Sequence, residues 1–261
     1  MFAVKQLIAI TTTLTCFFSV PASAETIDIN HTRLAPTIDG VMESVWQQAP
    51  WWPLDKHILG EIPSKEDFSG RFKLLWDKHK LYLLAEITDD VLMDYYADPK
   101  VRYWDDDCLE IFIDSDASGG NHLYSHNAFA YHVALDNQAA DIGAYKGDGP
   151  ESVVMLNSHL QSRWQRSQQS PNNIIWEVAL NLYPDNYTDE APLPPIKLKE
   201  NQEIGFMLAY CDADAGGARE HFMGSTTIVP VEGDKNLGYI TADVFGKYRL
   251  THSGPMQKQL R

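Results

Sequence analysis

The amino-acid sequence predicts an all-β fold, an antiparallel β-sandwich with one or two short helices. Three observations lead to this prediction. Short apolar runs recur along the chain and are separated by polar turn residues. Segments with helical periodicity are sparse. The sequence also contains no internal repeat, charge block or linker that would divide it, so we expect a single domain.

The N-terminal segment has the features of a secretory signal peptide. Lys5 is followed by an apolar or hydroxylic run over residues 7–20. Ala22 and Ala24 then place small residues at the two positions that a signal peptidase recognises before its cleavage site. The run is too short to span a bilayer comfortably, and no later segment is long and apolar enough to do so. We therefore expect a signal peptide over residues 1–24, a domain over 25–261 and a periplasmic or secreted location.

The strands are predicted where apolar and polar residues alternate between turns. We expect strands at residues 68–77, 80–89, 107–114, 127–135, 160–167, 174–182, 203–212, 239–242 and 246–250. The first two are joined by a tight polar turn over residues 77–79. In the strand at 107–114, the aliphatic residues from 109 onward form one face, and Cys108, Glu110 and Phe112 form the other.

Helical structure is expected in only two places. Residues 41–49 favour a short helix with Trp46 on its buried side, ended by Pro50, and residues 184–187 favour a turn. Trp46, Trp76 and Trp176 lie in apolar periodic segments, which indicates that they belong to the core.

The composition excludes two classes of protein. The 261 residues contain 36 acidic and 21 basic side chains, a net charge of −15, so no basic surface is available to neutralise nucleic-acid phosphates. Hydrophobic residues make up 44% and aromatic residues 11%, which is enough to build a core and excludes wholesale disorder.

The segment that points most directly to a function is Tyr103-Trp104-Asp105-Asp106-Asp107. An indole in a polar loop can stack on a sugar ring, and Glu110, on the non-core face of the following strand, can accept hydroxyl hydrogen bonds. The alternative is a tryptophan packed beneath a loop beside a solvated glutamate. No serine-hydrolase, zinc-protease or phosphate-loop motif occurs, so we expect a binding protein and not an enzyme.

Two further features leave alternatives open. Asp114 and Asp116 resemble the start of a calcium loop, but Ser125 stands where the EF-hand pattern requires glutamate, so they are weak candidates for a structural Ca²⁺. Cys108 and Cys211 lie in strand-like runs and form either a disulfide or two buried free thiols.

Two motifs resemble a known family. The first is Thr37-Ile38-Asp39-Gly40 followed by Glu43 and Trp46, and the second is Trp104-Asp105-Asp106-Asp107-Cys108-Leu109-Glu110-Ile111-Phe112-Ile113-Asp114. Both are similar to family 9 carbohydrate-binding modules, a branch of the DOMON-like β-sandwich group. The resemblance implies an immunoglobulin-like or jelly-roll sandwich and non-catalytic binding of saccharides, often at chain ends. It also implies stacking by Trp104, a hydrogen bond from the ligand to Glu110, a role in carbohydrate catabolism and a glycoside hydrolase as partner.

The chain departs from the family pattern at two positions. His132 stands where the family has a binding arginine, and no tryptophan follows Trp176 to complete an aromatic pair, which leaves Arg219 and Phe222 as candidates. DOMON-like sandwiches can also hold a non-covalent b-type haem. The residues available as axial ligands for this alternative are Met93, Met207 and Met223 with His132 or His221.

Overall fold

The computed structural model describes residues 26–167, 170 and 172–252. The predicted signal peptide, residues 1–24, lies outside the described residues. Within the described part of the chain, no helix is long and apolar enough to cross a membrane.

Strands and short 3₁₀ turns make up the regular structure of the described residues. The strands are β1 (Ile27–His31), β2 (Trp52–Leu54), β3 (Lys56–Gly60), β4 (Phe68–Trp76), β5 (Leu81–Asp89), β6 (Cys108–Asp114), β7 (Phe129–Ala134), β8 (Ala139–Ile142), β9 (Val153–Met155), β10 (Leu160–Arg166), β11 (Asn173–Leu180), β12 (Glu203–Asp212), β13 (His221–Gly224) and β14 (Gly246–Thr251). The 3₁₀ turns are η1 (Ser44–Gln48), η2 (Tyr103–Asp105), η3 (Pro150–Ser152) and η4 (Ala242–Val244).

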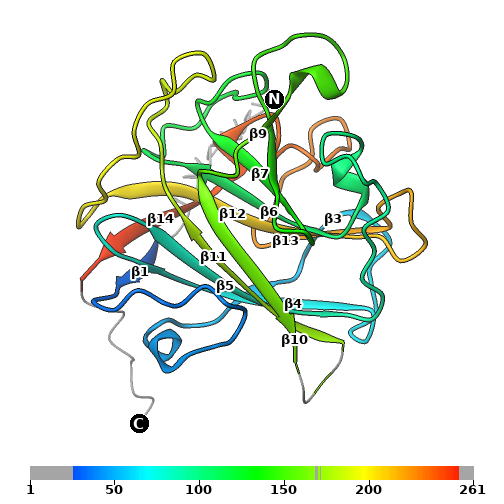
Figure 1. The fold of residues 1–261 in the computed structure, drawn as a ribbon, viewed down its shortest axis with the longest axis horizontal. Coiled ribbons are helices and arrows are strands. Elements are labelled where there is room, and N and C mark those ends of the chain that lie inside the picture. Colours follow the sequence, from blue (N-terminus) through cyan, green and yellow to red (C-terminus); the bar gives the residue numbers. More distant parts are fainter. Residues whose placement is uncertain (1–25, 168–169, 171, 253–261) are drawn as a thin grey trace, which may run out of the picture.

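The strands form two layers that pack face to face (Figure 1). The first layer has the order β10-β11-β5-β4, and the second has the order β14-β12-β6-β7-β8-β9. Phe72 of β4 packs against Phe206 of β12 with ring centroids 5.9 Å apart, and Phe68 stacks on Tyr210 at 5.4 Å. These contacts cross the core, so the predicted all-β sandwich is confirmed.

The first strand joins the two layers. β1 pairs in parallel with both β4 and β14, whereas the pairs among the other strands are antiparallel. The sandwich is therefore one continuous mixed sheet in which β1 adds two parallel pairings to the predicted antiparallel arrangement.

Two predicted elements differ in the structure. The helix expected over residues 41–49 is only the 3₁₀ turn η1, although Trp46 is fully buried as predicted. The strand expected over 239–242 is a turn that leads into η4, with an isolated bridge between Thr241 and Asn121. A four-residue apolar run is too short to fix a strand without a neighbouring strand along its whole length.

The outer face of the second layer carries the polar residues of interest. Leu109, Ile111 and Ile113 of β6 point into the core between the layers, so Glu110 projects to the opposite face by the period of two. Glu110 faces His132 of β7 on one side and Ala209 of β12 on the other. Ala209 is fully buried in a second hydrophobic cluster on this face, together with Cys211 and Phe222.

Candidate functional site

Trp104 is held in place by the aspartates that follow it. Asp105 Oδ1 accepts a hydrogen bond from the Arg219 backbone amide (3.1 Å), and Asp105 Oδ2 accepts one from Arg102 Nε (2.8 Å). Asp106 accepts from the amides of Tyr95 and Tyr96. These carboxylates are therefore occupied in fixing loops, and η2 presents Trp104 with 40% of its surface exposed.

Glu110 collects three hydrogen-bond donors on one of its oxygens. Its Oε1 lies 2.8 Å from His132 Nε2 and 3.2 Å from an Arg219 guanidinium nitrogen, and it accepts from Cys211 Sγ at 3.0 Å. The Glu110 side chain is only 3% exposed and that of Arg219 only 7%. A buried carboxylate paired and hydrogen-bonded in this way is held in one orientation.

The pKa of Glu110 reflects these neighbours. Burial alone would raise the pKa of this carboxyl, but the attraction of His132, the hydrogen bond to it and the charge of Arg219 outweigh burial and hold the pKa below its ordinary value. Burial opposes the charge of Arg219, but the neighbouring thiols and Glu110 raise its pKa further. Glu110 and Arg219 therefore form a charged pair at neutral pH.

These groups open onto one hollow of about 300 Å³. The residues that line it are Tyr103, Trp104, Glu110, His132, Ile142, Arg219, Asn236 and Tyr239. Tyr103 packs its ring edge-on against His132, with centroids 4.5 Å apart. An exposed aromatic plate beside convergent polar groups is the composition expected of a site for a polyhydroxylated ligand.

Four of the five candidate residues come together in this hollow: Trp104, Glu110, His132 and Arg219. Phe222 does not line it, and this expectation is corrected. Its side chain is 1% exposed and lies under the guanidinium of Arg219, 4.1 Å from Cζ to the ring centroid. On β13, Phe222 belongs to the buried face, so it supports Arg219 and cannot itself stack on a ligand.

The sequence reasoning missed Tyr239 and Asn236. Tyr239 was assigned to a strand and nothing was predicted for Asn236, whereas the segment before η4 brings both to the lining of the hollow. One signal in the sequence could have pointed to Tyr239. No tryptophan follows Trp176, so another aromatic residue late in the chain, such as Tyr239, was a candidate for its place.

The two cysteines lie directly opposite each other on β12 and β6, and both are free buried thiols. Burial raises the pKa of both thiols, which keeps them protonated and unreactive. The structure therefore matches the second alternative left open by the sequence. Cys211 also serves the site, because its thiol donates to Glu110 Oε1.

The weak calcium candidates do not form a group of metal ligands in the described residues. Asp114 accepts hydrogen bonds from the backbone amides of Asp116 and Gly119, so it fixes a turn. Three other carboxylates gather instead. Asp89 and Asp212 are the last residues of β5 and β12, and Asp107 comes just before β6. All three are buried and place ligand oxygens within 4.8 Å of one another.

This aspartate cluster has the properties of a cation site. Burial and mutual repulsion raise the pKa of Asp212 to about 9 and that of Asp107 to about 8, and burial raises the pKa of Asp89 to about 6. Asp89 Oδ1 and Asp212 Oδ2 are buried without a hydrogen-bond partner in the described residues. Other oxygens of the cluster have donors: Asp107 accepts from the amides of Met93 and Ala213, and Asp89 Oδ2 accepts from the Tyr210 hydroxyl. Three buried carboxylates with two unpartnered oxygens, and with no basic side chain among their hydrogen-bond partners in the described part of the chain, offer the hard oxygen ligands that Ca²⁺ requires.

The geometry does not favour the haem alternative. His132 Nε2 contacts Glu110, and His221 Nε2 contacts Asp67 at 3.1 Å, so both imidazoles already have carboxylate partners. Met207 and Met223 are buried in two different hydrophobic clusters, and no methionine lines the hollow that contains His132.

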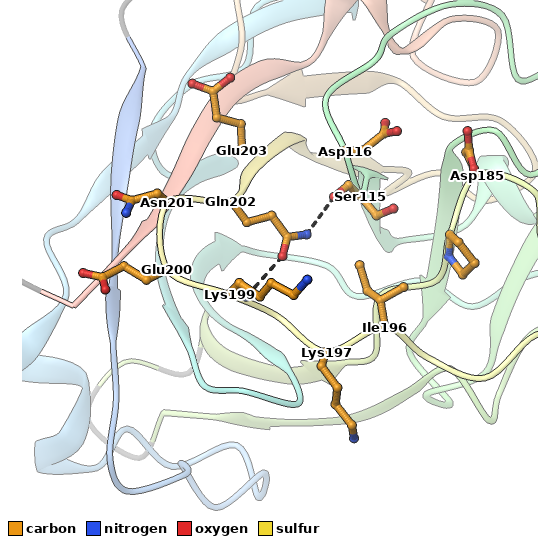
Figure 2. A pocket seen from close by; sticks show the side chains of 11 residues that line it. Ser115, Asp116, Asp185, Ile196, Lys197, Lys199, Glu200, Asn201, Gln202 and Glu203 are labelled. Carbon is orange, nitrogen blue, oxygen red and sulfur yellow. Dashed lines mark hydrogen bonds between the residues drawn. The ribbon is translucent and has the colours of Figure 1, made fainter.

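A larger hollow of about 550 Å³ lies elsewhere, between the Asp114 turn and the segment before β12 (Figure 2). Gln202 crosses it, donating to the Ser115 carbonyl at 2.9 Å and accepting from the Lys199 amide at 3.2 Å. No aromatic side chain lines this hollow. It therefore lacks the stacking surface that makes the hollow at Trp104 the stronger candidate.

Comparison with known proteins gives one family. The model of the family described as "Carbohydrate family 9 binding domain-like" matches residues 38–253. Endo-1,4-beta-xylanase C of Paenibacillus barcinonensis is 27% identical over 197 residues, and exoglucanase XynX of Acetivibrio thermocellus is 25% identical over 184. These matches cover 74% and 70% of this chain but only 15% and 14% of the two enzymes.

Solved structures show the same fold. A family 9 carbohydrate-binding module from Caldicellulosiruptor kristjanssonii, in complexes with cellotriose and with glucose, superimposes with a TM-score of 0.62 at 18% identity. The superposition covers 91% of this chain and 98% or more of that module.

Proposed function

The chain belongs to the carbohydrate family 9 binding domain-like family, and from this premise we propose that it binds saccharides, without catalysis, in the hollow lined by Trp104 and Glu110. The observation that carries the proposal is the placement of a half-exposed indole beside a buried, charge-paired carboxylate in one cavity. Sugar recognition needs both parts, an apolar plate for C–H groups and fixed acceptors for hydroxyl groups.

Each residue has a distinct part in this proposal. Trp104 offers its exposed ring face to the sugar. Glu110 accepts hydrogen bonds from three protein groups at Oε1, and two of them, His132 and Arg219, set its orientation. Its other oxygen, Oε2, is the acceptor offered to the sugar. Tyr239 supplies a second aromatic wall. One stacked ring and a few hydrogen bonds give a modest affinity, with a Kd on the order of 10 µM to 1 mM.

We also propose that residues 25–261 act as one exported binding domain that recruits or assists a glycoside hydrolase in carbohydrate catabolism. The support is that the family model covers residues 38–253 and that the matched regions of the relatives belong to a xylanase and an exoglucanase. The chain spans about a seventh of the length of those enzymes, so their activities are not assigned to it.

The structural calcium is proposed at the aspartate cluster of Asp89, Asp107 and Asp212, not at Asp114 and Asp116. The support is the set of converging buried oxygens described above. The ion would offset two of the three negative charges of these carboxylates, which lie at the ends of β5 and β12 and just before the start of β6.

The test is a glycan array with residues 25–261, run with calcium and with a chelator, followed by calorimetric titration of the ligands that bind. We expect binding to saccharides at micromolar to millimolar concentration. A chain that is folded and calcium-loaded but binds no glycan in either measurement would overturn the proposal.

A further inference from the structure

A second hollow lies on another side of Trp104. It has a volume of about 250 Å³ and shares Tyr103, Trp104 and Ile142 with the first, so the two cavities are neighbours separated by these side chains. Its remaining lining comes from Lys100, Val101, Arg102, Tyr124, Gly147, Gly149, Pro150, Ser152 and Val153. Each hollow alone lies near or below the lower limit of about 300 Å³ for ligand sites, which suggests a ligand that occupies both.

The charge of the second hollow is opposite to that of the whole chain. Lys100 and Arg102 are the charged side chains that line it, and no carboxylate does, although acidic residues outnumber basic ones by 36 to 21. Arg102 is already paired with Asp105. The Lys100 ammonium has no ion pair within the described residues; nearby Asp98 accepts from the Lys100 backbone amide and does not line the hollow.

The second hollow also has its own aromatic wall. Tyr124 is 39% exposed and packs edge-on against Tyr145, with ring centroids 4.9 Å apart. The backbone of Tyr124 has φ of 64°, in the left-handed region that costs a residue with a side chain about 1 kcal/mol or more. The fold therefore keeps an exposed aromatic residue in the lining that Trp104 shares, at some energetic cost to its backbone.

We propose that this hollow is a second glycan subsite, one that takes an acidic sugar, a uronic acid unit attached to the sugar held in the first hollow. This inference rests on the proposed function. The Lys100 ammonium attracts the carboxylate of the uronic acid, and Tyr124 packs against its ring. The preferred ligand is then an oligosaccharide that carries a uronic acid, not a neutral monosaccharide.

The test compares three ligands by calorimetry: xylose, xylobiose, and xylobiose that carries one glucuronic acid unit. We expect the acidic ligand to bind about two- to fivefold more tightly than xylobiose in low salt, and this preference to disappear near 1 M NaCl. Lys100→Met should remove the preference and leave xylobiose binding unchanged. Lys65→Met, which changes an exposed lysine outside both hollows, should keep the preference.

Tyr124→Ala tests the ring. This substitution should lower the affinity for the acidic ligand about three- to tenfold and leave the affinity for xylose unchanged. The control is Tyr95→Ala, at an exposed tyrosine outside both hollows, which should change neither affinity. Equal binding of acidic and neutral ligands by the unaltered chain would overturn the second subsite and leave the proposed function standing. If the chain bound none of the three ligands and no glycan of the wider array, the proposed function itself would be overturned.

Discussion

At the scale of single residues, the site depends on Glu110 and the cation that compensates it. The carboxylate is buried, and Arg219 is the permanently charged group that contacts it. The Arg219 guanidinium also packs over the ring of Phe222, and the Arg219 backbone amide donates a hydrogen bond to Asp105. Removing the guanidinium leaves the buried Glu110 carboxylate without the charge of Arg219. The free energy of unfolding lost in this way exceeds the net contribution of the ion pair.

We therefore expect Arg219→Met to lower the free energy of unfolding by about 2–4 kcal/mol in urea denaturation. The double variant Glu110→Gln with Arg219→Met should recover a large part of that loss, because no charge is then buried alone. If the two substitutions instead added their separate losses, the two side chains would not be coupled as described.

A pH titration of sugar binding gives a second expectation. Because the pKa of Glu110 is held below its usual 4.5, the carboxylate stays ionised at any pH above that value. A depressed pKa in the folded chain means that the contribution of Glu110 to stability and binding is present above 4.5 and is lost as the pH falls further. Calorimetry between pH 3.5 and 8 should show affinity falling only below about 4.5; a loss centred near neutrality would contradict this role.

Four of the residues singled out in the sequence line one hollow, and the signals that point to Trp104 and Glu110 are local. Trp104 and Glu110 lie only six residues apart, on η2 and on β6, and the alternation of β6 places Glu110 on the face away from the core. The cysteine that donates to Glu110 and the tyrosine that closes the hollow come from β12 and a late turn, and only strand pairing brings them near. Phe222 was misplaced because its strand face depends on the pairing of β13 with β12 and β3.

At the scale of elements, the pairing of β3 with β13 positions the loop that carries Arg219. Gly60, at the end of β3, has φ of +82° and lies opposite His221. A Cβ at this position would come 1.7 Å from the Glu220 carbonyl oxygen, which is next to Arg219. The close approach of the two backbones therefore requires glycine here.

Gly60→Ala should lower the free energy of unfolding by about 2–4 kcal/mol and also weaken sugar binding, because the Glu220 backbone has to move. Gly233→Ala is the matched control. Its φ is +91°, but a Cβ there meets no atom within 4 Å, so it should cost about 1 kcal/mol and leave binding unchanged. Urea denaturation and calorimetry of both variants measure the two effects; equal behaviour would show that β3 does not support the site.

The long strands were predictable and the short ones were not. β4, β5, β6, β10, β11, β12 and β14 follow the predicted ranges closely, because six to ten residues of alternation or a continuous apolar run between turns leave little ambiguity. β2, β8, β9 and β13 have three or four residues each, too few to show a period. The parallel pairing of β1 depends on partners from both ends of the chain, which local patterns do not specify.

At the scale of the whole molecule, the fold brings three buried aspartates together where the ends of β5 and β12 meet the start of β6. Asp89, Asp107 and Asp212 were unrecognised in the sequence because they are far apart along the chain and each follows the turn chemistry common to strand ends. Their convergence exists only in the folded sandwich. Cation binding there is linked to folding, since the unfolded chain has no such group of oxygens.

Calcium should therefore raise the stability of the chain, by about 2.7 kcal/mol when the free ion is at a hundred times its Kd. Asp212→Asn should abolish this gain without lowering stability in chelator, because it removes one ligand and one buried repulsion. Asp116→Asn, in the turn first considered for calcium, should retain the gain. Thermal unfolding with calcium and with chelator gives the comparison, and a calcium effect lost in Asp116→Asn but kept in Asp212→Asn would contradict the assignment.

The central claim is that the exposed indole of Trp104 is the surface on which a sugar stacks. Its most direct test is calorimetry in which a saccharide that binds the unaltered chain is titrated into the Trp104→Ala variant and, separately, into the Tyr95→Ala variant. We predict that Trp104→Ala loses about tenfold or more in affinity while its thermal unfolding stays within a few degrees, and that Tyr95→Ala binds normally. Unchanged affinity in a folded Trp104→Ala variant would contradict the claim.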